Sequence, residues 1–156
     1  MPDTAIAKIE NALQAQLQAW PGLAGYSVQT DVNEAEAVEA GADKVIRIYT
    51  VAWNVEQSDE QWQTLHNATI NFEVVQTSQA TGSISRANQE AIAHIVGAIA
   101  SDRSVGGRLQ DIQEVDVASS EADGLDTDAA SLQTSVLFFT SRSDWFTIVG
   151  VGGALF

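Results

Sequence analysis

The sequence predicts an α+β fold in which two helices pack against a mostly antiparallel sheet of four to five strands. Two observations lead to this class. Apolar residues recur every three or four positions near residues 4–20 and 85–100, which is typical of helices buried on one side. Segments rich in β-branched and aromatic residues follow one another without an intervening helix, which favours antiparallel pairing. A chain of 156 residues is expected to form a single domain, residues 1–156.

The first helix is predicted over residues 4–20. Its apolar face consists of Ile6, Ile9, Leu13, Leu17 and Trp20. Asp3 or Thr4 is expected to cap the first turn, because a short polar side chain can accept a hydrogen bond from an unpaired backbone N–H there. Pro21-Gly22 is expected to stop the helix.

Two strands are predicted to follow. Residues 26–29 indicate a short strand and the polar residues 33–42 a loop. The clearest strand signal covers residues 44–55, which are apolar on both faces; this indicates a central strand or one covered by a neighbouring subunit. Residues 57–65 are expected to be a long connection or a short helix. Residues 69–77 predict a strand with one apolar and one polar face.

The second half of the chain is predicted to begin with a helix that Ser85 caps and that ends near residue 100. Its apolar stripe consists of Ala91, Ile92, Ile95, Val96 and Ile99. An acidic loop is expected over residues 119–128, followed by a strand over residues 132–141. One side of that strand would carry Leu132, Thr134, Val136, Phe138 and Thr140, and the other side Leu137 and Phe139.

A further strand is predicted over residues 109–118, between the second helix and the acidic loop. Strict alternation would place Val115 and Val117 on one face of this strand. Glu114 and Asp116 would then lie on the opposite face.

Two segments stand out from this regular pattern. The run from Asp102 to Leu109 contains adjacent glycines, Gly106 and Gly107, directly after a helix. Because glycine reaches positive φ without steric cost, they predict a structural turn that carries no catalytic group. Residues 145–156 are apolar, glycine-rich and free of charged side chains. Residues 145–151 are either a last edge strand in the domain core or a segment used in assembly, and we expect residues 152–156 to contact a partner.

The formal net charge is −14, from 21 acidic and 7 basic residues. Phosphates and anionic lipid headgroups bind basic side chains, so specific nucleic-acid binding and membrane binding are not expected. Two stretches, 31–60 and 111–128, hold most of the acids. They are either solvated surfaces that keep the protein soluble or a surface that repels another polyanion. The sequence has no cysteine, no secretory signal and no apolar run long enough to span a bilayer.

Few residues form a pattern that indicates catalysis. His66 and His94 lack a metal-binding spacing and are expected to be structural. A nucleophile elbow and a phosphate-binding loop of the Gly-x-x-x-x-Gly-Lys type are absent from the sequence. The acids Asp123, Asp126 and Asp128 do not match the spacing of an EF-hand calcium loop. We therefore expect a protein that is not an enzyme and that needs no metal or other cofactor.

The order of elements, the run from Asp102 to Gly107 after the second helix, and the acidic strand and loop that follow resemble tail terminator (tail completion) proteins of long-tailed bacteriophages. The opening helix and the strand around residues 134–141 fit the same pattern, so the resemblance spans most of the chain. The apolar segment after Trp145 has no place in that pattern.

The resemblance implies a structural subunit that closes into a ring, usually a hexamer. Such a ring caps the tail tube, stops its polymerisation and provides the interface to the head connector. The expected partners are copies of this chain, the tail tube protein and a head-completion or connector protein. DNA would pass through without specific binding, and no membrane is involved. The expected location is the tail or neck of the virion, after assembly in the host cytoplasm.

Two sets of site residues follow from these considerations. The candidates for assembly contacts are Trp53, Trp62, Trp145, Phe146, Leu155 and Phe156. The candidates for an acidic lumen are Glu34, Glu36, Glu39, Asp111, Glu114, Asp116, Asp123, Asp126 and Asp128. Repulsion between such acids and phosphates would let DNA pass without sticking.

Three alternatives remain open at this point. The first is another neck or tail-tube protein of the same kind of particle. The second is a hydrolase or metal-binding enzyme that uses the clustered acids, although these acids lie in segments expected to be exposed. The third is an acidic protein that mimics DNA and binds a basic partner.

Overall fold

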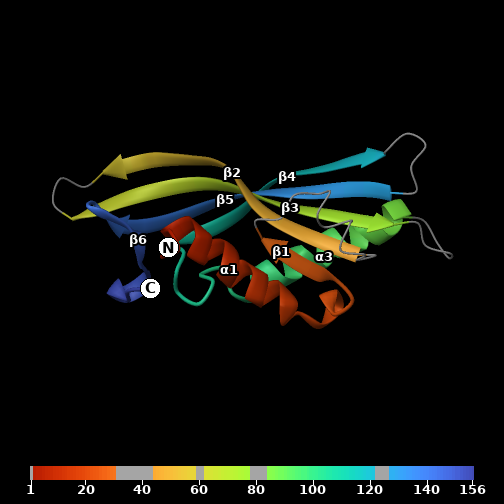
Figure 1. The fold of residues 1–156 in the computed structure, drawn as a ribbon, viewed down its shortest axis with the longest axis horizontal. Coiled ribbons are helices and arrows are strands. Elements are labelled where there is room, and N and C mark those ends of the chain that lie inside the picture. Colours follow the sequence, from red (N-terminus) through yellow and green to blue (C-terminus); the bar gives the residue numbers. More distant parts are fainter. Residues whose placement is uncertain (1, 31–43, 59–61, 78–83, 122–126) are drawn as a thin grey trace.

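The computed structural model describes residues 2–30, 44–58, 62–77, 84–121 and 127–156. These residues form a long twisted sheet with two α-helices on one face (Figure 1). The strand order is β1-β2-β3-β5-β4, and β6 also pairs with β5. The α+β class is confirmed. The sheet has six strands rather than four to five, because β6 forms near the end of the chain.

Helix α1 (Ala5–Gln18) forms where the helical period of apolar residues predicts it. Thr4 caps it: the Thr4 hydroxyl accepts a hydrogen bond from the backbone N–H of Ala7 at 3.3 Å. A short 3₁₀ helix, η1 (Pro21–Leu23), follows. The fixed φ of Pro21 suits its first turn.

Strand β1 (Ser27–Thr30) pairs in parallel with β2 (Lys44–Ser58), the one departure from antiparallel pairing in the described sheet. Strand β2 then forms a long antiparallel pair with β3 (Gln63–Thr77). The prediction of a connection or short helix is wrong for residues 57–58 and 63–65, which belong to β2 and β3, whereas residues 59–61 lie outside the described residues. Their polar residues are tolerated there because one face of each strand meets water.

Strand β5 (Thr127–Ser141) pairs with β3 along its whole length. Its other edge is shared by two strands placed end to end. Strand β4 (Asp111–Glu121) pairs with the first part of β5, and β6 (Asp144–Val149) pairs with its last residues. The predicted alternation along β5 is confirmed: Leu132, Thr134, Val136, Phe138 and Thr140 are buried beneath the helices.

Strand β4 departs from the predicted alternation. Its register with β5 shifts between Glu114 and Asp116, which pair with the consecutive residues Thr134 and Gln133. This β-bulge places one extra residue, Val115, in the strand. Glu114 and Asp116 therefore lie on opposite faces of the sheet, and the expectation that they share one face is wrong.

Helix α3 (Ile84–Ser101) packs beside α1 on the same face of the sheet. It begins before Ser85, so Ser85 lies inside the helix instead of capping it. Between the two helices, the Gln16 amide donates to the carbonyls of Ala98 at 2.7 Å and Asp102 at 3.0 Å. No described helix is both long and apolar enough to cross a membrane.

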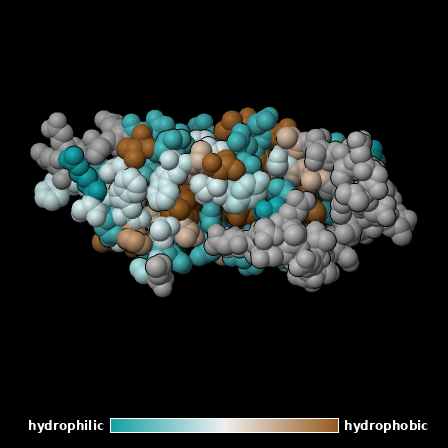
Figure 2. Space-filling model, turned by 45° about the horizontal axis from the view of Figure 1, so that its top comes forward, coloured by the Kyte–Doolittle hydropathy of each residue, from teal (hydrophilic) through white to brown (hydrophobic). Residues whose placement is uncertain are grey.

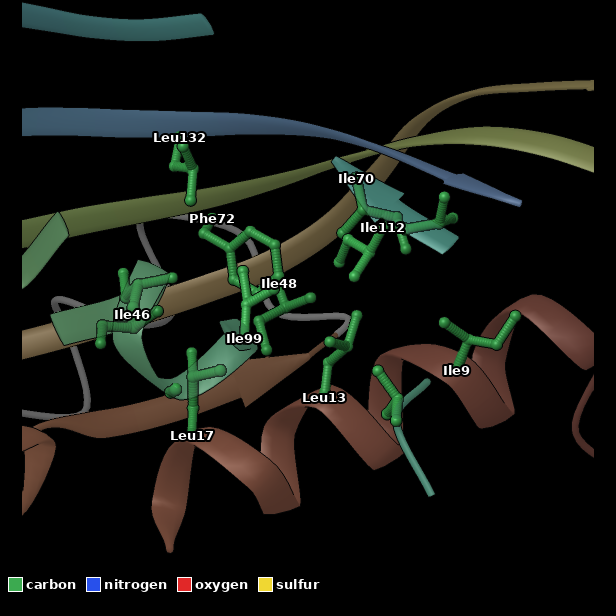
Figure 3. Close-up of a cluster of buried hydrophobic side chains, with 14 of the residues drawn as sticks. Ile9, Leu13, Leu17, Ile46, Ile48, Ile70, Phe72, Ile99, Ile112 and Leu132 are labelled. Atoms are coloured by element: carbon green, nitrogen blue, oxygen red, sulfur yellow. The ribbon is translucent and has the colours of Figure 1, made fainter. Parts of the chain in front are cut away.

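The core lies between the two helices and the sheet. Figure 3 shows Ile9, Leu13 and Leu17 of α1 facing the sheet residues Ile70 and Phe72, all fully buried. Burying each such side chain contributes about 1.5–3 kcal/mol to stability.

The opposite face of the sheet, here called the helix-free face, carries polar side chains. These include Asn67, Asn71, Glu73, Gln133 and Ser135.

The sheet extends past the start of α1, at the left of Figure 1. This end, here called the overhang, consists of the last part of β2, the first part of β3, the end of β5 and β6. The helices do not cover it, so its side chains must pack on one another or stay at the surface.

Candidate assembly surfaces

The turn between α3 and β4 is organised by the carboxylate of Asp102. One oxygen accepts from the hydroxyl of Ser104 at 2.6 Å and from its backbone N–H at 3.0 Å, and the other accepts from the N–H of Gly106 at 2.7 Å. These hydrogen bonds, with that from the Ser104 hydroxyl the largest cause, hold the pKa of Asp102 below its ordinary value. Gly106 and Gly107 have φ of 67° and 85°, as expected for a structural turn.

This turn also holds the last residues of the chain. The carbonyl of Gly107 accepts a hydrogen bond from the N–H of Val151 at 2.8 Å. Phe156 and Ile148 exchange two backbone hydrogen bonds of 3.1 Å each, and the guanidinium of Arg108 lies 4.5 Å from the centre of the Phe156 ring. Phe156 thus packs partly against its own domain. Leu155 points outward and is 70% exposed.

Lys8 of α1 also binds the segment 145–156. Its ammonium donates to the carbonyl of Phe146 at 2.7 Å and to that of Phe156 at 3.3 Å. The aromatic ring of Phe146 itself remains about half exposed. The segment 145–156 is therefore anchored by its backbone while several of its apolar side chains face outward.

A cluster of aromatic rings fills the overhang. The ring of His66 is fully buried, stacks on Phe138 at 4.8 Å between ring centres, and meets the edge of Trp145 at 4.7 Å. The indole N–H of Trp53 donates to Nδ1 of His66 at 2.9 Å, and Nε2 of His66 lies 2.8 Å from the hydroxyl of Thr140. Because an indole nitrogen can only donate, His66 must be neutral with its proton on Nε2.

The aromatic assembly candidates therefore divide into two groups. Trp53 is mainly a packing residue, because its ring contacts His66, Phe138 and Trp145. Trp62 is the most exposed large apolar side chain described, at 76%. Trp145 combines both roles: one side packs on the buried cluster, and 41% of the residue remains exposed.

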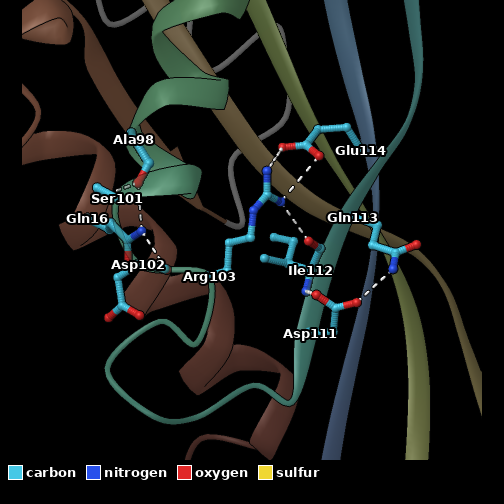
Figure 4. A network of polar contacts seen from close by, with 9 residues as sticks. All are labelled: Gln16, Ala98, Ser101, Asp102, Arg103, Asp111, Ile112, Gln113 and Glu114. Atoms are coloured by element: carbon cyan, nitrogen blue, oxygen red, sulfur yellow. Dashed lines mark hydrogen bonds and ion pairs between the residues drawn. The ribbon is translucent and has the colours of Figure 1, made fainter.

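The acidic candidates that the structure describes do not share one environment. The Arg103 guanidinium binds both carboxylate oxygens of Glu114, at 3.0 and 3.2 Å, on the helix side of the sheet (Figure 4). Partial burial raises the pKa of Glu114, but the bonds from Arg103 outweigh this effect and leave the pKa lowered. Glu114 is thus already neutralised within the subunit and is a poor candidate for a lumen.

Asp111 and Asp116 pair with Leu137 and Gln133 of β5, which places both acids on the helix-free face. The Asp111 carboxylate accepts from the N–H of Ile112 at 2.9 Å and from the amide of Gln113 at 2.7 Å. Neither of these donors is charged, so the negative charge of Asp111 remains at the surface. The other lumen candidates lie outside the described residues or side chains: Glu34, Glu36, Glu39, Asp123, Asp126 and Asp128.

Four valines of the strands are exposed, although the sequence does not single them out as site residues. Val51 and Val55 of β2 are 48% and 50% exposed, and Val115 and Val117 of β4 are 61% and 58% exposed. Val51 and Val115 lie at β-bulges, which depend on pairing with a distant strand and cannot be read from local alternation. Val55 and Val117 pair in regular register, and nothing in their local sequence distinguishes them from buried valines.

His94 of α3 contacts two side chains from the described part of the chain. His94 lies 3.4 Å from the indole nitrogen of Trp20 and 3.9 Å from the carboxylate of Glu90. Across the described residues, no three histidine or acidic side chains come close enough together to hold a metal ion.

The similarity of this chain to known proteins lies in its structure. No protein family matches the sequence, and no curated protein matches it. Among solved structures, a chain from the virion of a native gene transfer agent particle is similar, with a TM-score of 0.50 and 13% sequence identity. The similarity covers 83% of this chain and 92% of that chain. At this identity the likeness establishes that the two chains share a fold.

Proposed function

We propose that the protein is a structural subunit of a phage-like particle and that it acts as a tail terminator. In this role, copies close into a ring that caps the tail tube, stops its growth and meets the head connector. The observation that carries the proposal is the likeness to a chain of a gene transfer agent virion. Because it covers 92% of that chain, the likeness concerns nearly a whole subunit. The resemblance of the sequence to tail terminators favours this role within such a particle.

The distribution of apolar side chains supports an assembly role. On the face shown in Figure 2, apolar atoms lie in separate patches among polar ones. Among the described residues, the exposed large apolar ones are Val51, Val55, Trp62, Val115, Val117, Trp145, Phe146, Val151 and Leu155. Tryptophan and phenylalanine at a surface are typical of the centres of protein–protein contacts. Several such patches suit a subunit with more than one neighbour.

The acid–base properties of two described carboxylates, Asp102 and Glu114, favour a structural role over hydrolysis. A general acid needs a pKa raised toward neutrality, usually in an apolar pocket. The pKa values of Asp102 and Glu114 are lowered, because hydrogen bonds stabilise their charged forms. His66 is enclosed by aromatic rings and fully buried, so it has no access to a substrate.

Imaging distinguishes a terminator from a tube protein. Purified terminator is expected to appear in electron micrographs as rings or as monomers, with solution mass showing one defined size. A tube protein would instead form open-ended tubes of many lengths. Such tubes would contradict the proposal.

A second measurement tests the role in the particle. In particles produced without this chain, tails are expected to grow to uncontrolled lengths and to lack heads. Supplying the wild-type chain restores defined tails. Normal tails with attached heads in its absence would rule out a terminator function.

A further inference from the structure

We propose that His66 acts as an acid-sensitive latch: one added proton on its ring releases Trp53 and the last part of β2 from the aromatic cluster of the overhang, while the rest of the domain stays folded. The latch is a property of the single chain, so it does not depend on the proposed role in a tail. It makes the shape of the overhang, where Val55, Trp145 and Phe146 are exposed, depend on pH.

The hydrogen bonds of the His66 ring leave no place for a second proton. Nδ1 accepts the indole N–H of Trp53 at 2.9 Å, and Nε2 donates to the hydroxyl of Thr140 at 2.8 Å. That hydroxyl in turn donates to the carbonyl of Ser141 at 3.0 Å. A proton on Nδ1 would set two N–H donors against each other, because an indole nitrogen cannot accept. Protonation therefore requires Nδ1 of His66 and Trp53 to separate.

No counter-ion among the described residues stabilises a charge on His66. The charged groups on the elements around it have other positions or partners. Glu56, beside it on β2, accepts a hydrogen bond from the amide of Asn67 on the opposite face of the sheet. Lys8 of α1 donates to backbone carbonyls. The remaining groups are Glu10, which accepts from Thr50, Asp144, which accepts from the N–H of Phe146, and Arg142 in the turn before β6. Burial accordingly lowers the pKa of His66.

The last part of β2 is the side of the cluster that is free to move. His66 lies on β3, which is held by β2 at one edge and by β5 at the other. Beyond Ile48, strand β2 has no strand partner on its outer edge among the described residues. Register shifts interrupt its pairing with β3 both before and after Trp53. Interrupted segments at a sheet edge are where local opening costs least.

Native-state hydrogen exchange of the Trp53 indole N–H tests the latch, since this proton exchanges with solvent after its bond to His66 opens. The measurement is made in His94→Gln, in which His66 is the sole histidine. After correction for the intrinsic exchange rate, we expect the open fraction to rise about tenfold per pH unit as the pH falls from 6.5 toward the pKa of His66. Low concentrations of urea should hardly change it, because a local opening exposes little surface.

Two sets of backbone amides in the same sample serve as internal controls. Strand β1 (Ser27–Thr30) is another short edge strand, and it pairs with β2 only between Val45 and Ile48, away from Trp53. Its local opening should not vary with pH in this range. The amide of the fully buried Ile70 should exchange through global unfolding, which low concentrations of urea increase strongly.

Two variants separate the latch from a general loss of stability. His66→Asn places an amide oxygen near the position of Nδ1 but does not titrate, so the pH dependence of Trp53 exchange should disappear. Trp53→Phe removes the donor that opposes the second proton. The pKa of His66, measured by NMR of its ring, should therefore rise toward its ordinary value.

Two results in the chain that retains His66 and Trp53 would overturn the inference. One is exchange of the Trp53 indole N–H that does not vary with pH. The other is protection and urea dependence equal to those of Ile70, because the proton would then unfold the whole domain instead of opening one edge. Both results are obtained without His66→Asn or Trp53→Phe, so the test remains decisive if either variant fails to fold.

Discussion

At the scale of single residues, the most constrained side chain is His66. It is fully buried, and its two ring nitrogens engage side chains from two other strands, Trp53 of β2 and Thr140 of β5. The Thr140 hydroxyl in turn donates to the carbonyl of Ser141 at 3.0 Å. Every donor in this series of hydrogen bonds has one acceptor, and the series persists only while Nδ1 of His66 is unprotonated.

Burial lowers the pKa of His66 below its ordinary value of 6.5. Protonation of His66 therefore destabilises the folded state. Between the two pKa values the unfolded chain binds more protons than the folded chain, so stability falls as the pH drops below about 6.5. We expect the free energy of unfolding in urea to decrease by up to about 1.4 kcal/mol per pH unit in this window. Most carboxylates titrate at lower pH and contribute little there.

Two variants check that His66 is responsible. His66→Phe removes the titrating group, so its unfolding free energy should be lower at pH 7 but nearly independent of pH between 6.5 and 5. His94→Gln removes the partly exposed histidine and should keep the pH dependence of the wild type. The same slope in His66→Phe as in the wild type would show that another group titrates.

At the scale of elements, the local spacing of apolar residues predicts those helices and strands whose form depends on their own sequence. Both helices and the alternation of β5 follow from the spacing of their own apolar residues. The length of the β2–β3 hairpin and the bulge at Val115 depend instead on pairing between distant strands, so no local pattern contains them. The sequence marks Gly106-Gly107 and residues 145–156 as unusual. It does not show that the two segments contact each other, because that contact is formed by backbone atoms.

The contact between the turn and the last residues depends on Gly150. A Cβ atom added at this position would overlap the carbonyl of Gly107 and the ring of Phe156. We expect Gly150→Ala to lower the unfolding free energy by about 1–3 kcal/mol in urea titrations, as overpacking does elsewhere. Gly25→Ala is the matched control, because a Cβ there meets nothing within 4 Å. It should change stability by less than about 1 kcal/mol. Equal effects of the two substitutions would refute the proposed close contact.

At the scale of the whole molecule, the sheet separates two different surfaces. The helices and the buried core occupy one face, and the helix-free face carries polar side chains with Asp111 and Asp116. In the proposed ring, one face of each sheet would turn toward the channel. The helix-free face is the better suited to line a channel for DNA, because its carboxylates repel phosphates.

Reversing charge on this face tests that orientation. In Asp111→Lys/Asp116→Lys, the lysines would bind phosphates that the wild type repels. Even about 1.4 kcal/mol of added binding slows DNA release roughly tenfold. We expect particles with normal tails to deliver less DNA per particle, and delivery to recover as salt rises, because salt weakens phosphate contacts. The matched control, Asp3→Lys/Glu90→Lys, makes the same change of net charge at exposed positions on the helix side. It should deliver DNA normally. Equal defects in both variants, or a defect that salt does not relieve, would place Asp111 and Asp116 away from the path of DNA.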